Sequence, residues 1–125
     1  MKHLRVDDAI DYQEKRRTKQ RVIITETMTS ELLCYEPGQG TVPHHHVKED
    51  EAFLVLEGRG TMTVDDESFH VEKHSLVFAP VGSSHGIQAD KDSRLSVIYF
   101  RSPGRGAKEM GMVIDQQASA NADSR

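Results

Sequence analysis

Histidines and one glutamate of this chain have the spacing of metal ligands. Residues two apart in a strand point to the same face, so the imidazoles of His44 and His46 can share one cation. Glu51, five residues after His46, opens an apolar run and can return a carboxylate to the same end of the fold. With His85, these residues offer three imidazoles and one carboxylate. Such a donor set suits Fe, Mn, Co, Ni, Cu or Zn rather than Ca or Mg.

The remaining histidines are expected to have no ligand role. They are His3 near the chain start, His45 on the strand face opposite His44, His70 on an exposed strand face and His74 at a turn. His45 keeps two readings, a surface or interface residue or a partner that moves protons behind the ligands. A bare pair of histidines two apart recurs easily by chance, so the pair alone also fits a polar loop.

Composition limits the class of protein. The 125 residues fit one domain, with 36% apolar and 29% charged residues. A formal net charge of −4 argues against nucleic acid or an anionic membrane as partner and favours small molecules or proteins. No apolar run is long enough to cross a bilayer and the first residues lack the apolar stretch of a signal peptide, so we expect a cytoplasmic protein. A single cysteine, Cys34, leaves only nitrogen and oxygen donors for a metal.

Short apolar or β-branched stretches separated by turn residues predict an all-β fold that closes into a sandwich or barrel. Turns are expected at residues 37–40, 58–60 and 65–67. The predicted strands cover residues 21–25, 28–35, 43–46, 52–57, 61–64, 68–72, 75–79, 86–89 and 95–100. We expect residues 1–20 to be a lead-in, 21–103 the barrel domain and 104–125 a loosely ordered tail.

Other polar residues give no clear catalytic acid or base. The charged run 14–21 is expected to be a solvated lead-in, and Tyr35, Tyr99 and Cys34 are expected to be packing residues. Arg59 and Arg94 are candidates for holding a substrate carboxylate, although nothing in the sequence puts them near the histidines.

The spacing of the candidate ligands resembles that of a known family. Gly38, His44, His46, Glu51 and Gly58 follow the first motif of the cupins in full. A second segment, separated from Gly58 by fifteen residues, is similar to the second cupin motif at Pro80, Gly82 and His85. It departs from that motif at its ends, where His74 and Ala89 stand in place of glycine and asparagine. Histidine tolerates the positive φ of a tight turn, so the turn is expected to survive at His74.

Resemblance to a small single-domain cupin implies a jelly-roll β-barrel with one divalent transition metal on His44, His46, Glu51 and His85. The superfamily covers dioxygenases, isomerases, lyases, sensors and storage proteins, so fold alone does not select an activity. The leading hypothesis is a small metal-dependent enzyme acting on an oxygen-rich organic molecule, by dioxygen chemistry or, with a redox-silent metal, by isomerisation or elimination. The alternative is a non-catalytic cupin that binds or senses a small molecule.

The run 52–56 is apolar on both faces of its strand, which indicates that the outer face also needs cover. Leu54 and Leu56 would otherwise be left in water. An N-terminal strand of the same chain or a second subunit can supply the cover, and we expect a homodimer.

Overall fold

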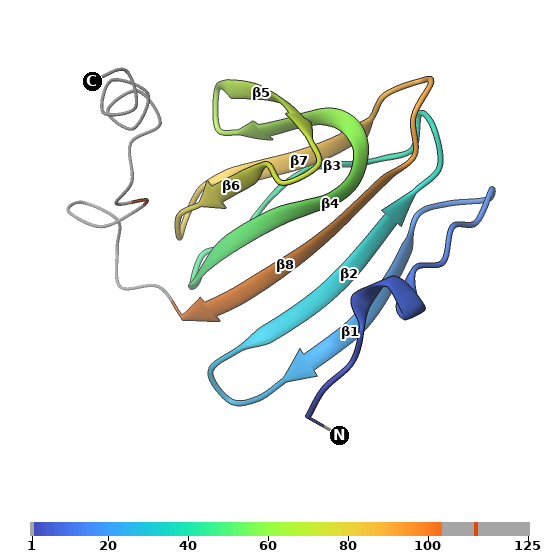
Figure 1. The fold of residues 1–125 in the computed structure, drawn as a ribbon. Helices are drawn as coiled ribbons and strands as arrows, with labels where there is room; N and C mark the ends of the chain where they lie inside the picture. The colour runs from blue at the N-terminus through green and yellow to red at the C-terminus, as the bar shows by residue number, and fades with distance from the viewer. Residues whose placement is uncertain (1, 104–111, 113–125) are drawn as a thin grey trace, which may run out of the picture.

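The computed structural model describes residues 2–103 and 112. The rest of the predicted tail, residues 104–111 and 113–125, lies outside the described residues. Strands dominate the fold, and the predicted all-β barrel of the jelly-roll type is confirmed (Figure 1). The elements are a 3-10 turn η1 (Val6–Ala9) and the strands β1 (Thr18–Ile24), β2 (Thr29–Tyr35), β3 (Gly40–His45), β4 (Glu49–Val64), β5 (Glu67–Glu72), β6 (Leu76–Ala79), β7 (Ser84–Ala89) and β8 (Leu95–Pro103).

The strands run antiparallel in the order β1-β2-β8-β4-β7-β3, and β5 and β6 also pair with β4. The first sheet contains β1, β2, β8, β6 and the first half of β4, and the second sheet contains β3, β7, β5 and the second half of β4. Strand β8, the last of the described strands, lies between β2 and β4 (Figure 1). The two sheets face each other across the core.

Strand β4 corrects one expectation. The predicted break at residues 58–60 is wrong, because the chain continues as one strand from Glu49 to Val64. A bulge between Val55 and Glu57 and a positive φ of 85° at Gly58 bend the strand, so its second half pairs in the other sheet. Glycine supplied backbone freedom as expected, but for a bend within a strand rather than for a turn. The other two expected turns are found, and His74 has the positive φ (75°) predicted for it.

The interior of the barrel follows the alternation of side chains along the strands. In β4, Glu51, Phe53 and Val55 are buried and face the core, while the residues between them are half-buried. The inner core cluster consists of Leu33, Tyr35, Phe53, Val55, Met62, Val64, Val71, Val77, Ala79, Ile87, Ala89, Leu95, Val97 and Tyr99. Several members of this cluster also line the cavity described below.

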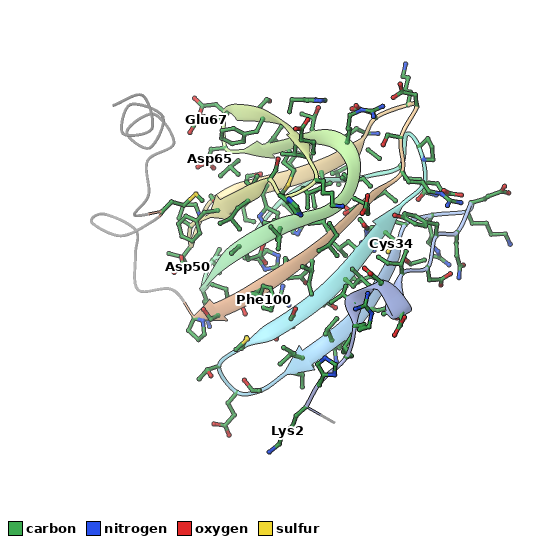
Figure 2. The ribbon with its side chains drawn as sticks, in the orientation of Figure 1. Lys2, Cys34, Asp50, Asp65, Glu67 and Phe100 are labelled. Atoms are coloured by element: carbon green, nitrogen blue, oxygen red, sulfur yellow. The ribbon has the colours of Figure 1, made fainter. Side chains whose placement is uncertain are left out.

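The outer face of the first sheet has its own apolar cluster. Leu32, Cys34 and Ile98 are buried there under the N-terminal segment, as the position of Cys34 in Figure 2 shows. Val6, Ala9, Ile10 and Tyr12 of that segment, together with Val22, Leu54 and Leu56, pack against the three. The outer face of this sheet is therefore covered in part by the same chain. The covering segment is a 3-10 turn followed by extended chain, whereas a strand was expected. Within the described residues, no helix is long and apolar enough to span a membrane.

Candidate metal centre

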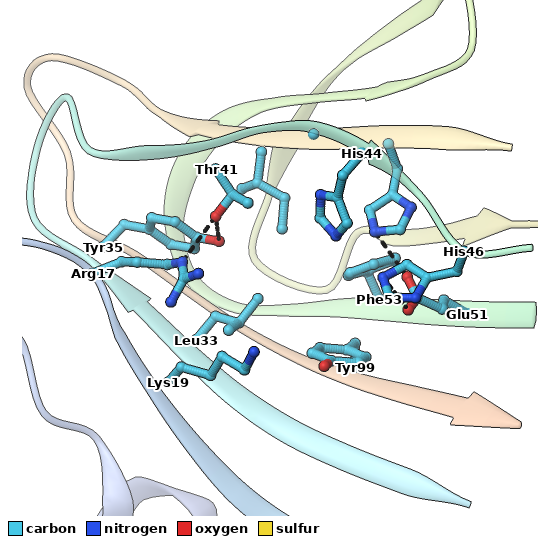
Figure 3. A pocket seen from close by; sticks show the side chains of 13 residues that line it. Arg17, Lys19, Leu33, Tyr35, Thr41, His44, His46, Glu51, Phe53 and Tyr99 are labelled. Carbon is cyan, nitrogen blue, oxygen red and sulfur yellow. Dashed lines mark hydrogen bonds and ion pairs between the residues drawn. The ribbon is translucent and has the colours of Figure 1, made fainter. Parts of the chain in front are cut away.

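The ladder between β3 and β7 brings two of the predicted ligands together. His44 and His85 are directly opposite in its register, and their ring centroids are 4.6 Å apart. His46 follows one residue after β3 ends, and its ring lies 5.0 Å from that of His44 and 5.4 Å from that of His85. One ring nitrogen from each of the three lies within 4.8 Å of the other two (Figure 3).

Glu51 reaches the same place from β4. Its side chain is 2% exposed, with Oε2 2.8 Å from Nε2 of His85 and Oε1 3.4 Å from Nε2 of His46. Despite this approach, Oε2 is a buried oxygen with no well-directed hydrogen bond. A neutral imidazole nitrogen and a carboxylate oxygen so close must share a proton or a cation, because both present lone pairs. All four predicted ligands are therefore neighbours.

A second layer of contacts orients these groups. Nδ1 of His44 lies 3.2 Å from the carbonyl oxygen of Val42, so this nitrogen donates and Nε2 is left free for a ligand role. Nη1 of Arg101 lies 3.4 Å from Nδ1 of His46 and 3.5 Å from Oε1 of Glu51. The Nε atom of Arg101 lies 3.3 Å from Oε2 of Glu49, which anchors the guanidinium beside the site.

The charges of this cluster set its protonation. Burial alone would raise the pKa of Glu51, but the close contact with His85 and its charge, the charge of His46 and that of Arg101 outweigh it and lower that pKa. Burial lowers the pKa of His46, and Arg101 adds to this while Glu51 opposes it. Both shifts favour an ionised carboxylate beside a neutral imidazole, which are the forms that bind metals.

The donor set fits a transition metal in chemistry and in spacing. Metal–nitrogen bonds of about 2.1 Å place two ligand atoms on one ion at most about 4.2 Å apart. The histidine nitrogens, all within 4.8 Å of one another, need only small ring movements to reach such bonds. Imidazole and carboxylate donors suit Fe, Mn, Co, Ni, Cu or Zn.

A cavity of about 50 Å³ opens beside the cluster, with room for about three to five water-sized groups. Tyr35 and Tyr99 line it and also have polar partners. The Tyr35 hydroxyl lies 2.9 Å from Oγ1 of Thr41, and the Tyr99 hydroxyl donates to the buried carboxylate of Glu31. Its full lining is Arg17, Lys19, Leu33, Tyr35, Thr41, His44, His46, Glu51, Phe53, His85, Gly86, Ile87 and Tyr99.

Two predicted arginine candidates lie elsewhere. Arg59 pairs with Asp90 and Asp92, at 3.8 and 3.3 Å, and is not in the cavity lining. Arg94 pairs with Glu36 and is not in that lining either. Neither arginine therefore takes the role of holding a substrate carboxylate in this cavity.

The other histidines and Cys34 lie away from the metal-ligand cluster. The histidines His3, His45, His70 and His74 are exposed, as expected, and lie outside the cluster of three histidine donors. Cys34 is buried on the outer face of the first sheet, where it packs as expected.

Sequence reasoning missed the cations of the cavity. The expectation that the charged run 14–21 is a solvated lead-in strand or turn is wrong for Arg17, which is half-buried and lines the cavity with Lys19. The available signal was their spacing, since residues two apart in a strand point to one side. That spacing alone did not show that the strand would lie at the barrel mouth.

A jelly-roll barrel with clustered histidines at its mouth defines a class of small β-barrel proteins. The family model described as "Cupin domain" matches residues 31–100, more than half of the chain, and the chain belongs to the cupin family. The family resemblance noted in the sequence is therefore confirmed.

The chain is also similar to individual proteins of known sequence or structure. The chain is 39% identical over 51 residues to the uncharacterized protein MJ1618 of Methanocaldococcus jannaschii, a match that covers 41% of each chain. It is 26% identical over 92 residues to the polyketide synthase CurC of Streptomyces cyaneus, covering 74% of this chain and 59% of that one. Both matches span less than two-thirds of the relative. The crystal structure of TT1209 from Thermus thermophilus superposes with a TM-score of 0.78 at 25% identity, covering 83% of this chain and 99% of that one.

Proposed function

We propose that this cupin is a metal-dependent enzyme that acts on a small, oxygen-rich organic molecule, with one divalent transition metal on His44, His46, Glu51 and His85. The observation that carries the proposal is the cluster itself: three imidazole donors within 4.8 Å and a buried carboxylate oxygen beside them without a directed hydrogen bond. Buried polar atoms normally have partners, and a cation held by the three imidazoles would be such a partner for this oxygen.

A bound dication would polarise an oxygen of the substrate or, if redox-active, support dioxygen chemistry. The protein's own residues prepare the site. The carbonyl of Val42 holds the His44 ring in one orientation, and Arg101 does the same for the His46 ring and the Glu51 carboxylate. Leu33, Phe53 and Ile87 form an apolar wall that limits water around the reacting groups.

The formal charge of the metal site and one relative both favour an oxygen-rich substrate. Three neutral imidazoles and one carboxylate leave a formal charge of about one on a bound dication, which favours an anionic or enediol-like oxygen ligand. The Streptomyces cyaneus relative is named as a polyketide synthase, and polyketides are rich in carbonyl oxygen. The proposal covers two reaction types. A redox-active metal would support an oxygenase reaction, and a redox-silent metal would support isomerisation or elimination.

The second candidate is a non-catalytic cupin that binds or senses a small molecule. Arg101 favours it, because its Nη1 lies 3.5 Å from Glu51 and gives the carboxylate a cation of the protein's own. In that case the cluster is an ion-pair network and the cavity only a binding site.

Elemental analysis of protein purified from metal-replete cells without chelator tests the proposal. We expect about one transition metal per chain, and loss of most of it in His46→Ala. His70→Ala changes an exposed histidine outside the cluster and is the matched control. A metal content near zero in the unmodified protein would reject the metal site. With metal present, oxygen uptake and product analysis then separate the catalytic from the non-catalytic form.

The proposal includes a homodimer. Leu76, Phe100 and Met28 remain exposed on or beside the part of the first sheet that the N-terminal segment leaves open. Burying apolar area is worth roughly 25 cal/mol per Å², which favours a second copy as cover. A cytoplasmic location also stays part of the proposal, and the free thiol of Cys34 is compatible with it.

A further inference from the structure

Arg17 is a half-buried cation that has no acidic partner among residues 2–103. Its Nε donates to Oγ1 of Thr41 at 3.0 Å, and Thr41 in turn contacts the Tyr35 hydroxyl. Among the residues that the structure describes, no carboxylate lies within 4.0 Å of its guanidinium, whereas Arg21 and Arg101 each have one. A guanidinium has five N–H donors, so four remain for a ligand. Figure 3 shows the group at the wall of the cavity.

Lys19 adds a second positive charge to the same wall. Its Nζ lies 3.7 Å from Oε1 of Glu31, an oxygen that also accepts the Tyr99 hydroxyl. Arg21 shares this carboxylate from 4.0 Å. Lys19 and Arg21 thus share the single charge of Glu31, while the charge of Arg17 is not offset by a carboxylate within 4.0 Å among the described residues. Within the lining, Arg17 and Lys19 against Glu51 leave one net positive charge, and a dication raises it to three.

The cation pair and the histidine cluster lie on different sides of one cavity (Figure 3). Between them, the lining is apolar, with Leu33, Phe53 and Ile87. A ligand that matches this pattern has an anionic end, a short carbon segment and a second oxygen-bearing end. The cavity volume of about 50 Å³ limits the enclosed part to a few heavy atoms.

We propose that Arg17 and Lys19 form an anion subsite, so that the substrate class is a short organic acid whose carboxylate contacts them while its other oxygen group faces the histidine cluster. This inference rests on the proposed function for the role of the second end. A carboxylate suits the guanidinium, because two parallel N–H donors match its two oxygens. Short dicarboxylates and oxo acids belong to this class.

Calorimetric titration of the full-length, Zn²⁺-loaded protein with malonate tests the subsite. We expect measurable binding, and a loss of at least about tenfold in affinity for Arg17→Gln, which removes a charge-assisted contact. Lys19→Gln is expected to lose less, since Glu31 already shares that charge. Arg59→Gln is the control of equal charge change, because Arg59 pairs with Asp90 and Asp92 outside the cavity. Dimethyl malonate, which lacks the charges, is expected not to bind.

A structural role of Arg17 has a different signature. Thr41→Val removes its hydrogen bond but keeps the guanidinium, and should retain most of the malonate affinity. If Thr41→Val loses as much as Arg17→Gln, or if Arg17→Gln binds malonate like the unmodified protein, the inference is overturned.

The metal content of each sample distinguishes a failure of the anion subsite from a failure of the proposed metal site. Zinc-loaded protein that ignores malonate would reject the subsite and leave the metal site standing. Metal-free protein that takes up no zinc but binds malonate through Arg17 would support the subsite and reject the metal site.

Discussion

At the scale of single residues, two acids compete for the role of carboxylate ligand. Glu51 is buried with its oxygens at 2.8 and 3.4 Å from histidine nitrogens. Glu49 is more exposed, lies 3.7 Å from the Nδ1 side of His46, and already pairs with Arg101. We therefore predict that Glu51→Gln weakens metal binding at least about tenfold, while Glu49→Gln changes it little.

Competition with a fluorescent chelator measures both affinities. Glutamine has the size of glutamate, so a difference in metal affinity between the two variants shows which carboxylate charge contributes to binding. Loss of metal in Glu49→Gln with unchanged affinity in Glu51→Gln would contradict the assignment of Glu51 as ligand.

The three tyrosines predict how the protein responds to alkaline pH. Burial is the main cause that raises the pKa of Tyr12, Tyr35 and Tyr99, and for Tyr99 the hydrogen bond to Glu31 adds to it. In the unfolded chain a phenol is half ionised at about pH 10. At that pH the native protein should show much less phenolate absorbance than the protein in denaturant.

The sign of the effect on stability follows. Because the folded pKa values are raised, these groups stabilise the fold fully below about pH 10, and this contribution is lost as the pH rises toward the folded values. Denaturant unfolding near neutral pH and above pH 10 measures the loss, which should be smaller in Tyr99→Phe. Native and unfolded protein that titrate together would contradict the raised pKa values.

At the scale of elements, the bend of β4 depends on Gly58. A Cβ atom there would come 1.6 Å from the carbonyl oxygen of Arg94, in addition to the strain of a φ of +85°. We predict that Gly58→Ala lowers the free energy of unfolding by at least about 2 kcal/mol. Gly38→Ala is the matched control, because Gly38 has a φ of +80° but nothing within 4 Å of the added atom.

Denaturant midpoints of the two variants give the comparison. The control should lose only the cost of the left-handed conformation, about 1–2 kcal/mol. Equal losses in both variants would show that the close contact at Gly58 relaxes without cost.

The elements also show how far sequence reasoning reaches. Spacing within a strand is local, so the pairing of His44 with His46 on one side and the turn at His74 were predictable from neighbouring residues. The continuity of β4 was not, because the same glycines fit a turn or a bulge until the partner strands are known. The cavity role of Arg17 was hidden for a similar reason, since it depends on contact with Thr41, 24 residues away.

At the scale of the whole molecule, the outer face of the first sheet predicts a homodimer. Leu76 is 51% exposed and Phe100 40% exposed on strands β6 and β8. Light scattering at micromolar concentration should report twice the chain mass of 14.1 kDa. Phe100→Glu should shift the mass to that of one chain, because it introduces a charge into the buried apolar contact.

Phe69→Glu is the control, since Phe69 has a similar exposure of 38% but lies on β5 of the other sheet. A single-chain mass for the unmodified protein would reject the dimer. A dimer that persists in Phe100→Glu and is lost in Phe69→Glu would move the interface to the second sheet.

The central position of β8 has a consequence for the order of folding during synthesis. Strand β2 can pair with β1 at once, but its other edge must wait for β8, as in the contact of Ser30 with Tyr99, which follows 69 positions later. The second sheet needs nothing beyond Ala89, so the ladder that holds His44 opposite His85 can form while β8 is still inside the ribosome. Until β8 emerges, β2 and β4 expose open edges that invite wrong pairing. In this order of synthesis, His44 can meet His85 before β8 closes the barrel.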